Sequence, residues 1–382
     1  MPLGGSQMAT APIIAEDRFA GDDLPWQAFT ASEAVSEWDD LALASAERNP
    51  FAESWYLLAA LENFDPAGDA RIFTYRVDGE LCGLMPLSRE ARYEGKPLPH
   101  LGNWMHANCF LGTPLVRKGH EEGFWRALLD HADECAGQAL FLHLHTVWLG
   151  GELDRALSRV CAAEGRQLGI VQSHERAVLP AITDPEAYLA QALSAKRRKD
   201  IRRRRRKLEE LGAVTVRRQH GSDDLDRWIA DFLRLESSGW KGEAASALAC
   251  NPRTRDLFEQ SMREGAKRGA LIRFELLLDG QPVAMLVNYD CAPASFGYKA
   301  AFDEAYAQCS PGMLLETVYI EQLDRPDIDW CDSCSAPDHP LLSHLWSDRR
   351  TMGRISVAIG GPVRRALFKT LLFVENSRGM SS

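Results

Sequence analysis

The chain carries the same β-hairpin pattern twice. Residues 71–87 read RIFTYRVDGELCGLMPL, and residues 271–287 read LIRFELLLDGQPVAMLV. In each stretch two apolar arms flank Asp-Gly, a dipeptide that favours the two-residue turns of β-hairpins. The repetition predicts two copies of one fold within the chain. A chance similarity between two hairpins is the alternative.

The elements predicted around these hairpins follow each other in a repeated order. The first unit is expected to have helices at 31–46, 51–64, 121–135 and 153–164, strands at 70–77, 81–87 and 139–145, irregular chain at 95–112 and extended chain at 169–180. The second is expected to have helices at 186–211, 223–238, 253–268, from 311, and at 337–350, with strands at 214–218, 271–278, 283–288, 296–302, 327–331, 354–359 and 366–374. We therefore predict an α/β protein with a flexible tail at 1–23, an N-terminal domain at 24–183 and a C-terminal domain at 184–382.

Length and composition fit a soluble protein of two domains. The chain has 382 residues, of which 45% are hydrophobic and 26% charged, as in ordinary globular proteins. No apolar run approaches the ~20 residues that cross a bilayer, and the N-terminus lacks the pattern of a secretory signal. Nine scattered cysteines fit free thiols in a reducing cytoplasm. Cys331 and Cys334 form a lone CxxC, for which buried thiols and a zinc or redox role are both open, and no metal site is predicted.

Charge is concentrated in one segment. Residues 196–207 read KRRKDIRRRRRK and carry +9, so the rest of the chain carries −19 of the total of −10. Such a segment indicates an anionic partner: coenzyme phosphates, an acidic carrier protein, anionic lipid at the inner membrane, or nucleic acid. The acidic remainder and the absence of aromatic residues from the run make nucleic acid unlikely. A solvated helix face is the alternative.

A phosphate-binding turn is predicted within residues 295–323. A strand at 296–302 and a short polar loop are followed by Pro311 and Gly312, which begin a helix. The first amides of a helix have no partner within the helix and attract anions, and glycine allows close approach to the backbone. The predicted contacts are Ser310, Gly312, Met313 and Leu314. An ordinary strand-to-helix connection is the alternative.

Several segments in order resemble the GNAT superfamily of acyl-CoA N-acyltransferases. They are similar to its tandem branch, which includes the Fem-type aminoacyl transferases and the bacterial acetyltransferases of cellulose synthesis. The segments are AKRRKDIRRRRRKLEELG, LESSGWKG, YKAAFDEAYAQCSPGMLL and DSCSAPDHPLLSHLWSDRR in the second half, with NPFAESWYLLAAL and DGELCGLMPL in the first.

The resemblance implies two tandem GNAT-like domains, each a mixed, mostly antiparallel sheet flanked by helices, of which the C-terminal one is catalytic. It implies that the strand at 296–302 parts from the strand at 327–331, that the pantetheine of an acyl-CoA co-substrate lies between them, and that no cofactor is bound permanently. The family usually has Gln/Arg-x-x-Gly-x-Gly/Ala before the helix, whereas this chain has QCSPGM at 308–313. Whether the donor is coenzyme A or a carrier protein therefore stays open.

The implied reaction is attack of a neutral amine on a thioester, which needs a base, an oxyanion donor and an acid. His339 with Asp338 is one candidate pair, and capping of the following helix is the alternative. Glu236 is a second candidate base, and a solvated helix face is its alternative. Further candidates are Asp303 for catalysis and Trp240, Lys241, Tyr298 and Lys299 for substrate binding.

The acceptor follows from resemblance alone. Within the tandem branch the chain is most similar to bacterial ceramide synthases, which acylate the amine of a sphingoid long-chain base. Two other classes stay open: a Fem-like transferase that uses aminoacyl-tRNA, and an acetyltransferase or non-catalytic scaffold in envelope polysaccharide synthesis.

Overall fold

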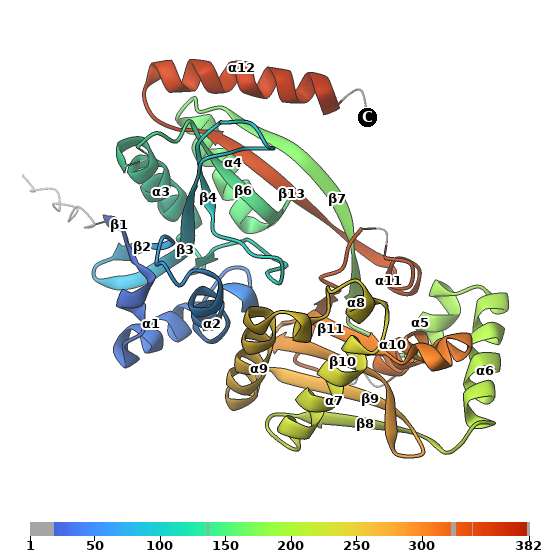
Figure 1. Ribbon diagram of the computed structural model, residues 1–382. Helices are drawn as coiled ribbons and strands as arrows, with labels where there is room; N and C mark the ends of the chain where they lie inside the picture. Colours follow the sequence, from blue (N-terminus) through green and yellow to red (C-terminus); the bar gives the residue numbers. More distant parts are fainter. Residues whose placement is uncertain (1–18, 136, 322–325, 338, 380–382) are drawn as a thin grey trace, which may run out of the picture.

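A computed structural model describes residues 19–135, 137–321, 326–337 and 339–379. The strands of these residues form one 13-stranded sheet in the order β1-β2-β3-β4-β6-β13-β7-β12-β11-β10-β9-β8, with β5 paired to β3 (Figure 1). The strands are β1 (Phe19–Pro25), β2 (Arg71–Val77), β3 (Glu80–Glu90), β4 (His100–Asn103), β5 (Leu115–Val116), β6 (Phe141–Trp148), β7 (Leu168–Pro180), β8 (Val214–His220), β9 (Leu271–Leu278), β10 (Gln281–Cys291), β11 (Ala294–Phe302), β12 (Trp330–Asp332) and β13 (Asp348–Ala358).

Helices cover both faces of this sheet. In the second half, α7 and α9 pack on one face of β9 and β10, and α5, α6 and α10 pack on the other. The α-helices are α1 (Ser32–Leu43), α2 (Ser54–Phe64), α3 (Glu121–Cys135), α4 (Glu152–Ala163), α5 (Pro185–Ala192), α6 (Ala195–Glu209), α7 (Leu225–Ser237), α8 (Trp240–Glu243), α9 (Pro252–Lys267), α10 (Pro311–Glu321), α11 (Leu342–Leu345) and α12 (Pro362–Gly379). Short 3-10 helices are η1 (Trp26–Phe29), η2 (Pro50–Ala52), η3 (Leu248–Cys250) and η4 (Glu304–Cys309).

The two halves of the sheet repeat one topology. Each has an antiparallel hairpin, β2–β3 or β9–β10, and each has one parallel strand pair, β4 with β6 or β11 with β12. Asp78 and Gly79 have positive φ, as do Asp279 and Gly280, which is the turn conformation that Asp-Gly favours. The predicted fold class, two GNAT-like units in tandem, is confirmed.

The last strand of each half lies beside the other half. β7 pairs with β12 of the second unit, while β13 pairs with β6 of the first, and β7 and β13 also pair with each other. One continuous sheet therefore joins the two units, as Figure 1 shows in the long green and red strands at its centre. The domain boundary between residues 183 and 184 stays a prediction.

A buried apolar core also connects the units. Trp55 and Tyr56 of α2 pack with Phe232 of α7, Phe258 of α9 and the strands β10 and β11. Because α2 belongs to the first half and the others to the second, the surfaces between the units are part of the hydrophobic interior. This core includes the face of β11 that carries Tyr298.

The predicted basic helix at 186–211 is wrong as one continuous helix. It is two helices, α5 and α6, because Leu193 has an extended backbone. Ser194 then caps α6, its hydroxyl accepting a hydrogen bond from the amide of Arg197 at 3.3 Å. Serine offers the backbone this alternative to a continuous helix. The break was not predicted because helix-forming residues are dense on both sides of it.

Two predictions near the C-terminus and two in the first half need correction. The helix predicted at 337–350 is reduced to α11, and β13 begins at Asp348. The strand predicted at 366–374 is part of helix α12, whose Phe368, Leu371 and Leu372 pack at helical spacing against the sheet. The irregular stretch at 95–112 contains β4. Residues 1–18 of the predicted tail lie outside the described residues, and from Phe19 the chain is strand β1.

Three histidines on β4 and β6 predict acid sensitivity of the fold. The rings of His143 and His145 are 4.3 Å apart, and His100 lies 5.7 Å from His143. Burial lowers the pKa of all three, to about 2 for His143 and to about 4 for His145, from 6.5. Between pH 6.5 and about 4 the unfolded chain therefore binds more protons than the folded chain, so the free energy of unfolding falls as pH falls.

In this window, we expect the free energy of unfolding to fall by about 1.4 kcal/mol per pH unit for each histidine that stays neutral in the folded chain. Urea unfolding at pH 7.5, 6.5 and 5.5 measures it. His145→Gln removes one titrating group and should make the pH dependence shallower. An unchanged slope in this variant would show that His145 does not titrate as its burial implies.

Candidate active site

The strands β11 and β12 part soon after they meet. Their parallel pairing is limited to Ala294↔Trp330, Ser295↔Cys331 and Phe296↔Asp332, whereas β11 continues to Phe302 beside β10. β12 ends at Asp332, and Cys334, with φ of +49°, turns the chain away. The predicted parting of these strands is confirmed. It leaves the segment 297–302 without β12 beside it, where an extended group can lie along the strand.

Gly297 marks the point where the parting begins. A Cβ atom at this position would lie 2.7 Å from the carbonyl oxygen of Ser333, so only glycine allows the two backbones to come this close. The pairing of β10 with β11 also shifts here, from Val287↔Lys299 to Asn288↔Gly297, which leaves Tyr298 as the extra residue of a β-bulge. Bulges redirect side chains and occur often beside active sites.

The corresponding gap in the first half is closed by the chain itself. β4 and β6 pair only at Leu101↔Leu142 and Gly102↔His143. Beyond this point the amide of Asn103 bridges the gap: its oxygen accepts from the backbone N–H of His145 at 2.7 Å, and its nitrogen donates to the carbonyl of the same residue at 3.0 Å. Gly112 makes a second contact across the gap, because its N–H donates to the carbonyl of Thr146 at 2.8 Å. In the second half, by contrast, β11 continues to Phe302 after its last pair with β12, Phe296↔Asp332.

A helix N-terminus lies at the open end of β11. Helix α10 begins at Pro311, after Ser310, whose φ is +49°. A Cβ atom on Gly312 would lie 3.4 Å from the ring of Phe302, the last residue of β11. The helix start is therefore adjacent to the end of β11 that pairs with β10 but not with β12. Its first amides, at Gly312 and Met313, are suited to bind a phosphate. The predicted contact at Leu314 is not supported, because its amide donates to the carbonyl of Ser310 at 3.1 Å.

Helix α6 brings cations to this turn. The guanidinium of Arg204 donates to the hydroxyl of Ser310 at 2.6 Å and to the carbonyl of Gln308 at 3.3 Å. The ammonium of Lys207 donates to the side-chain oxygen of Gln308 at 2.9 Å. Two fixed positive charges beside the N-terminus of α10 add to the attraction of its dipole for an anion.

A buried carboxylate faces β11 on the other side of the sheet. Glu236, at the C-terminal end of α7, is 4% exposed, and its carboxylate accepts a hydrogen bond from the amide of Leu248 at 2.8 Å. It lines a small cavity of about 30 Å³ together with Gly239 and residues 300–302 of β11. Its alternative as a solvated residue is therefore wrong.

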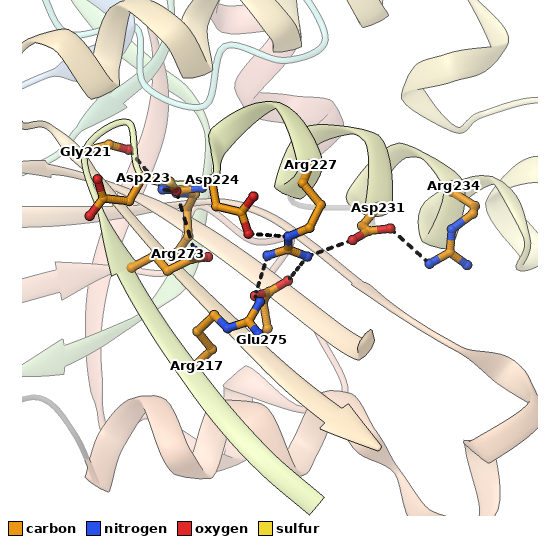
Figure 2. Close-up of polar contacts among 10 residues, drawn as sticks. Arg217, Gly221, Asp223, Asp224, Arg227, Asp231, Arg234, Arg273 and Glu275 are labelled. Carbon is orange, nitrogen blue, oxygen red and sulfur yellow. Dashed lines mark hydrogen bonds and ion pairs between the residues drawn. The ribbon is translucent and has the colours of Figure 1, made fainter. Parts of the chain in front are cut away.

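An ion network fixes α7 to the sheet (Figure 2). Arg227 of α7 donates to both oxygens of the fully buried Glu275 on β9, each at 3.0 Å, and Arg217 of β8 donates to Glu275 at 3.1 Å. Asp224 and Asp231 hold the same guanidinium from either side. A buried carboxylate with charge-assisted partners of this kind tolerates little movement, so the helix that carries Glu236 has a fixed position.

Tyr298 and Lys299 lie between the two units. Tyr298 is buried in the apolar core, and its hydroxyl makes no hydrogen bond within the described residues. Burial raises the pKa of Tyr298 to about 12, with the nearby Glu236 carboxylate adding to the rise. Lys299 donates to the side-chain oxygen of Asn108 at 2.7 Å. The loop that follows β4 in the first half therefore contacts the strand of the open gap.

The structure gives capping roles to two other candidates. His339 accepts from the amide of Leu342 at 3.2 Å through Nδ1, at the start of α11, and Asp303 accepts from the amide of Ala305 at 2.9 Å at the start of η4. Asp338 lies outside the described residues. Trp240 and Lys241 begin the short helix α8, and their side chains are outside the described set.

Sequence reasoning missed Arg204, Lys207 and Asn108 as parts of this region. Arg204 and Lys207 are two of ten basic residues in one run, and nothing in the run distinguishes them. The burial of Glu236 could have been predicted from its spacing. It lies four residues after Phe232 and eight after Trp228, on the apolar stripe of α7.

Comparisons with known proteins agree with this geometry. Residues 195–339 match the family model of the acetyltransferase (GNAT) domain. None of the curated proteins compared with the chain matches its sequence. FemX aligns at a TM-score of 0.55 and 12% identity, over 88% of this chain and 98% of that one. A protein of unknown function from Bacteroides thetaiotaomicron gives 0.55 and 11%, over 85% and 97%.

A third similar structure is the C-terminal domain of a putative lysylphosphatidylglycerol synthetase from Agrobacterium fabrum, with a TM-score of 0.52 and 13% identity, over 89% of this chain and 96% of that one. At such identities the likeness shows the fold alone. The domain match covers the open gap, the start of α10 and Glu236. The predicted enzyme class, a GNAT-type acyltransferase, is confirmed. No helix among the described residues is long and apolar enough to cross a membrane.

Proposed function

We propose that this protein transfers an acyl group from a pantetheine thioester to a primary amine in the gap beside β11. The observation that carries the proposal is the parting of β11 and β12 directly before the N-terminus of α10. A pantetheine arm along residues 297–302 would have its phosphate end at Ser310 and the amides of Gly312 and Met313. Acyl-CoA supplies such an arm, and an acyl carrier protein supplies the same arm without the nucleotide.

Glu236 is the proposed general base. A neutral amine attacks the thioester carbonyl, the C–N bond forms, and the amine proton passes to the Glu236 carboxylate. The C–S bond then breaks, and a proton from Tyr298 converts the leaving thiolate to a thiol. Because the pKa of Tyr298 is raised to about 12, its hydroxyl is protonated at neutral pH and available for this step. Backbone N–H groups of β11 are suited to stabilise the oxyanion.

The other predicted site residues have secondary places in this proposal. His339, with Asp338, is the runner-up for the base; its contact with α11 uses Nδ1. Asp303 orders the turn after β11, and Lys299, Trp240 and Lys241 would bind the acceptor. His339→Ala is expected to leave more activity than loss of the Glu236 carboxylate.

For the acceptor we propose a sphingoid long-chain base, so that the product is a ceramide. The support is the resemblance of the chain to bacterial ceramide synthases, together with the aromatic loop of the first half that contacts β11 through Asn108. An anionic membrane is the alternative partner of residues 196–207, and contact with it would bring the enzyme to such an acceptor.

Incubation of the purified protein with palmitoyl-CoA and 3-oxosphinganine tests the proposal. Mass spectrometry should detect the N-acyl product together with free coenzyme A. Amines without a long chain, such as glucosamine and lysine, serve as competing acceptors in parallel reactions. Acylation of these amines alone would remove the ceramide proposal and retain acyl transfer, whereas no thioester consumption with any acceptor would contradict both.

A Fem-like aminoacyl transferase is the second candidate. It is supported by the similarity of the fold to FemX and by the exposed cations of α6, which could hold RNA. Electrophoretic titration with bulk tRNA in 50 and 200 mM salt distinguishes the two. Tight, strongly salt-dependent binding would favour the aminoacyl donor.

A further inference from the structure

The outer face of helix α6 is a row of exposed cations. Lys199, Arg202, Arg203 and Arg206 share one side of the helix, at three- and four-residue spacing, and Lys196 and Lys207 lie at its ends. All six are exposed. The row extends for about 17 Å at the rise of an α-helix. Asp200 is the one acidic residue of the segment 196–207, and it forms an ion pair with Arg203 at 2.5 Å.

The row begins at the predicted phosphate site and continues away from it. Lys207 contacts Gln308 in the turn before α10, whereas Lys196 and Lys199 lie at the opposite end of α6. The apolar residues of the helix are turned inward, with Ile201 at 9% and Leu208 at 0% exposure. The outer face therefore offers charge without apolar side chains that could insert into a bilayer, which membrane-binding helices usually have.

The structure of the donor indicates that the row of cations on α6 binds a protein. In a pantetheine thioester the acyl group is at one end of the arm and a phosphate is at the other. Beyond that phosphate lies either a nucleotide or the serine of a carrier protein. A nucleotide ends close to the turn at Ser310, where Arg204 and Lys207 already supply two cations. Lys199 and Lys196 lie about 12 and 17 Å further along α6 from Lys207 at the rise of an α-helix, and this far part of the row matches the surface of a protein.

Charge elsewhere on the chain favours the same partner. With residues 196–207 removed from the count, the chain carries −19. An acidic protein is therefore repelled by most of the surface and attracted by α6, which orients its approach. Figure 1 places α6 at the outer edge of the second unit, beside α5 and α10, where a second protein has access.

We propose that the outer face of α6 docks an acidic acyl carrier protein, which delivers the acyl thioester on its phosphopantetheine arm to the gap beside β11. This inference rests on the proposed acyl transfer and specifies its donor. The carrier lies along α6 with its modified serine next to the turn at Gln308 and Ser310. The arm then enters between β11 and the chain that follows β12.

A charge-reversal variant tests the docking. The triple variant Lys199→Glu, Arg202→Glu and Arg206→Glu changes the outer face of α6 and avoids Arg204 and Lys207 at the turn. Its matched control, Lys96→Glu, Lys118→Glu and Lys369→Glu, makes the same change of charge at exposed residues far from α6 in the sequence. The dissociation constants of palmitoyl-loaded bacterial acyl carrier protein and of palmitoyl-CoA are measured for both variants and the wild-type protein at 150 mM salt.

We expect the α6 variant to bind the loaded carrier protein at least tenfold more weakly than the wild-type protein, with palmitoyl-CoA affinity within threefold and the control variant unchanged. Equal carrier affinity in all three proteins would overturn the docking. Carrier binding absent from the wild-type protein, with palmitoyl-CoA bound, would overturn it and leave the proposed acyl transfer intact. Failure to bind either donor would contradict the acyl transfer itself. Loss of binding to vesicles of phosphatidylglycerol in the α6 variant, with carrier binding unchanged, would assign the face to a membrane.

Discussion

Replacement of Glu236 by Gln is expected to lower turnover at least a hundredfold while donor affinity stays within twofold. The amide of glutamine can still accept the hydrogen bond from Leu248, so the local fold is retained, but it cannot take a proton from the amine. General bases contribute about 10²- to 10⁴-fold to rate. The measurement is the steady-state rate of thioester consumption at saturating acceptor, with donor affinity taken from calorimetry.

The matched control is Asp226→Asn on the same helix, whose carboxylate is 86% exposed and remote from the cavity that Glu236 lines. This variant should keep wild-type turnover. If Glu236→Gln also kept wild-type turnover, the carboxylate would have no catalytic role, and His339 would become the leading candidate for the base.

Replacement of Gly312 by Trp is expected to weaken donor binding at least a hundredfold. The side chain would extend from the first turn of α10 beside Phe302, where the phosphate end of the pantetheine arm is proposed to lie. Such a group blocks access to the backbone amides, although it leaves the strands themselves untouched. Calorimetric titration with palmitoyl-CoA gives the dissociation constant, and thermal unfolding checks that the variant is folded.

Gly312→Ala is the control for this substitution. A methyl group at this position makes an ordinary contact of 3.4 Å with the ring of Phe302, so donor affinity should change little. Donor affinity that is the same for glycine, alanine and tryptophan would place the phosphate elsewhere.

The parts of the site that depend on local sequence could be predicted from it. Gly312 at a helix start after a strand and Asp-Gly in both hairpins have local backbone requirements, so the residue type itself carries the signal. The order of strands around 296–302 came with the family resemblance. Glu236 was identified as a candidate, but its burial depends on η3, which supplies the amide of Leu248.

The remaining features depend on contacts between distant segments. Closure of the first gap requires Asn103 to meet His145, and the link between the units requires Asn108 to meet Lys299. Neither asparagine differs in sequence context from an ordinary loop residue. The helix α12 was predicted as a strand because residues 366–374 are nearly continuous in apolar character, and periodicity alone does not separate a short buried strand from a helix.

The asymmetry between the two gaps determines how many reactions one chain can carry out. The first gap is bridged by Asn103 and by the segment at Gly112, for which any larger residue would collide with the carbonyl of His145 at 2.1 Å. In the second, β11 and β12 stop pairing at Phe296 and Asp332. One chain should therefore bind one donor. The first unit contributes the loop after β4, which contacts β11, and no second donor site is expected in it.

The most direct test of this account is a crystal structure with a non-hydrolysable thioether analogue of palmitoyl-CoA. We predict one analogue per chain, with its pantetheine arm along residues 297–302 of β11 and its pyrophosphate on the first amides of α10. A pantetheine arm between β4 and β6, or one bound away from β11 altogether, would contradict it.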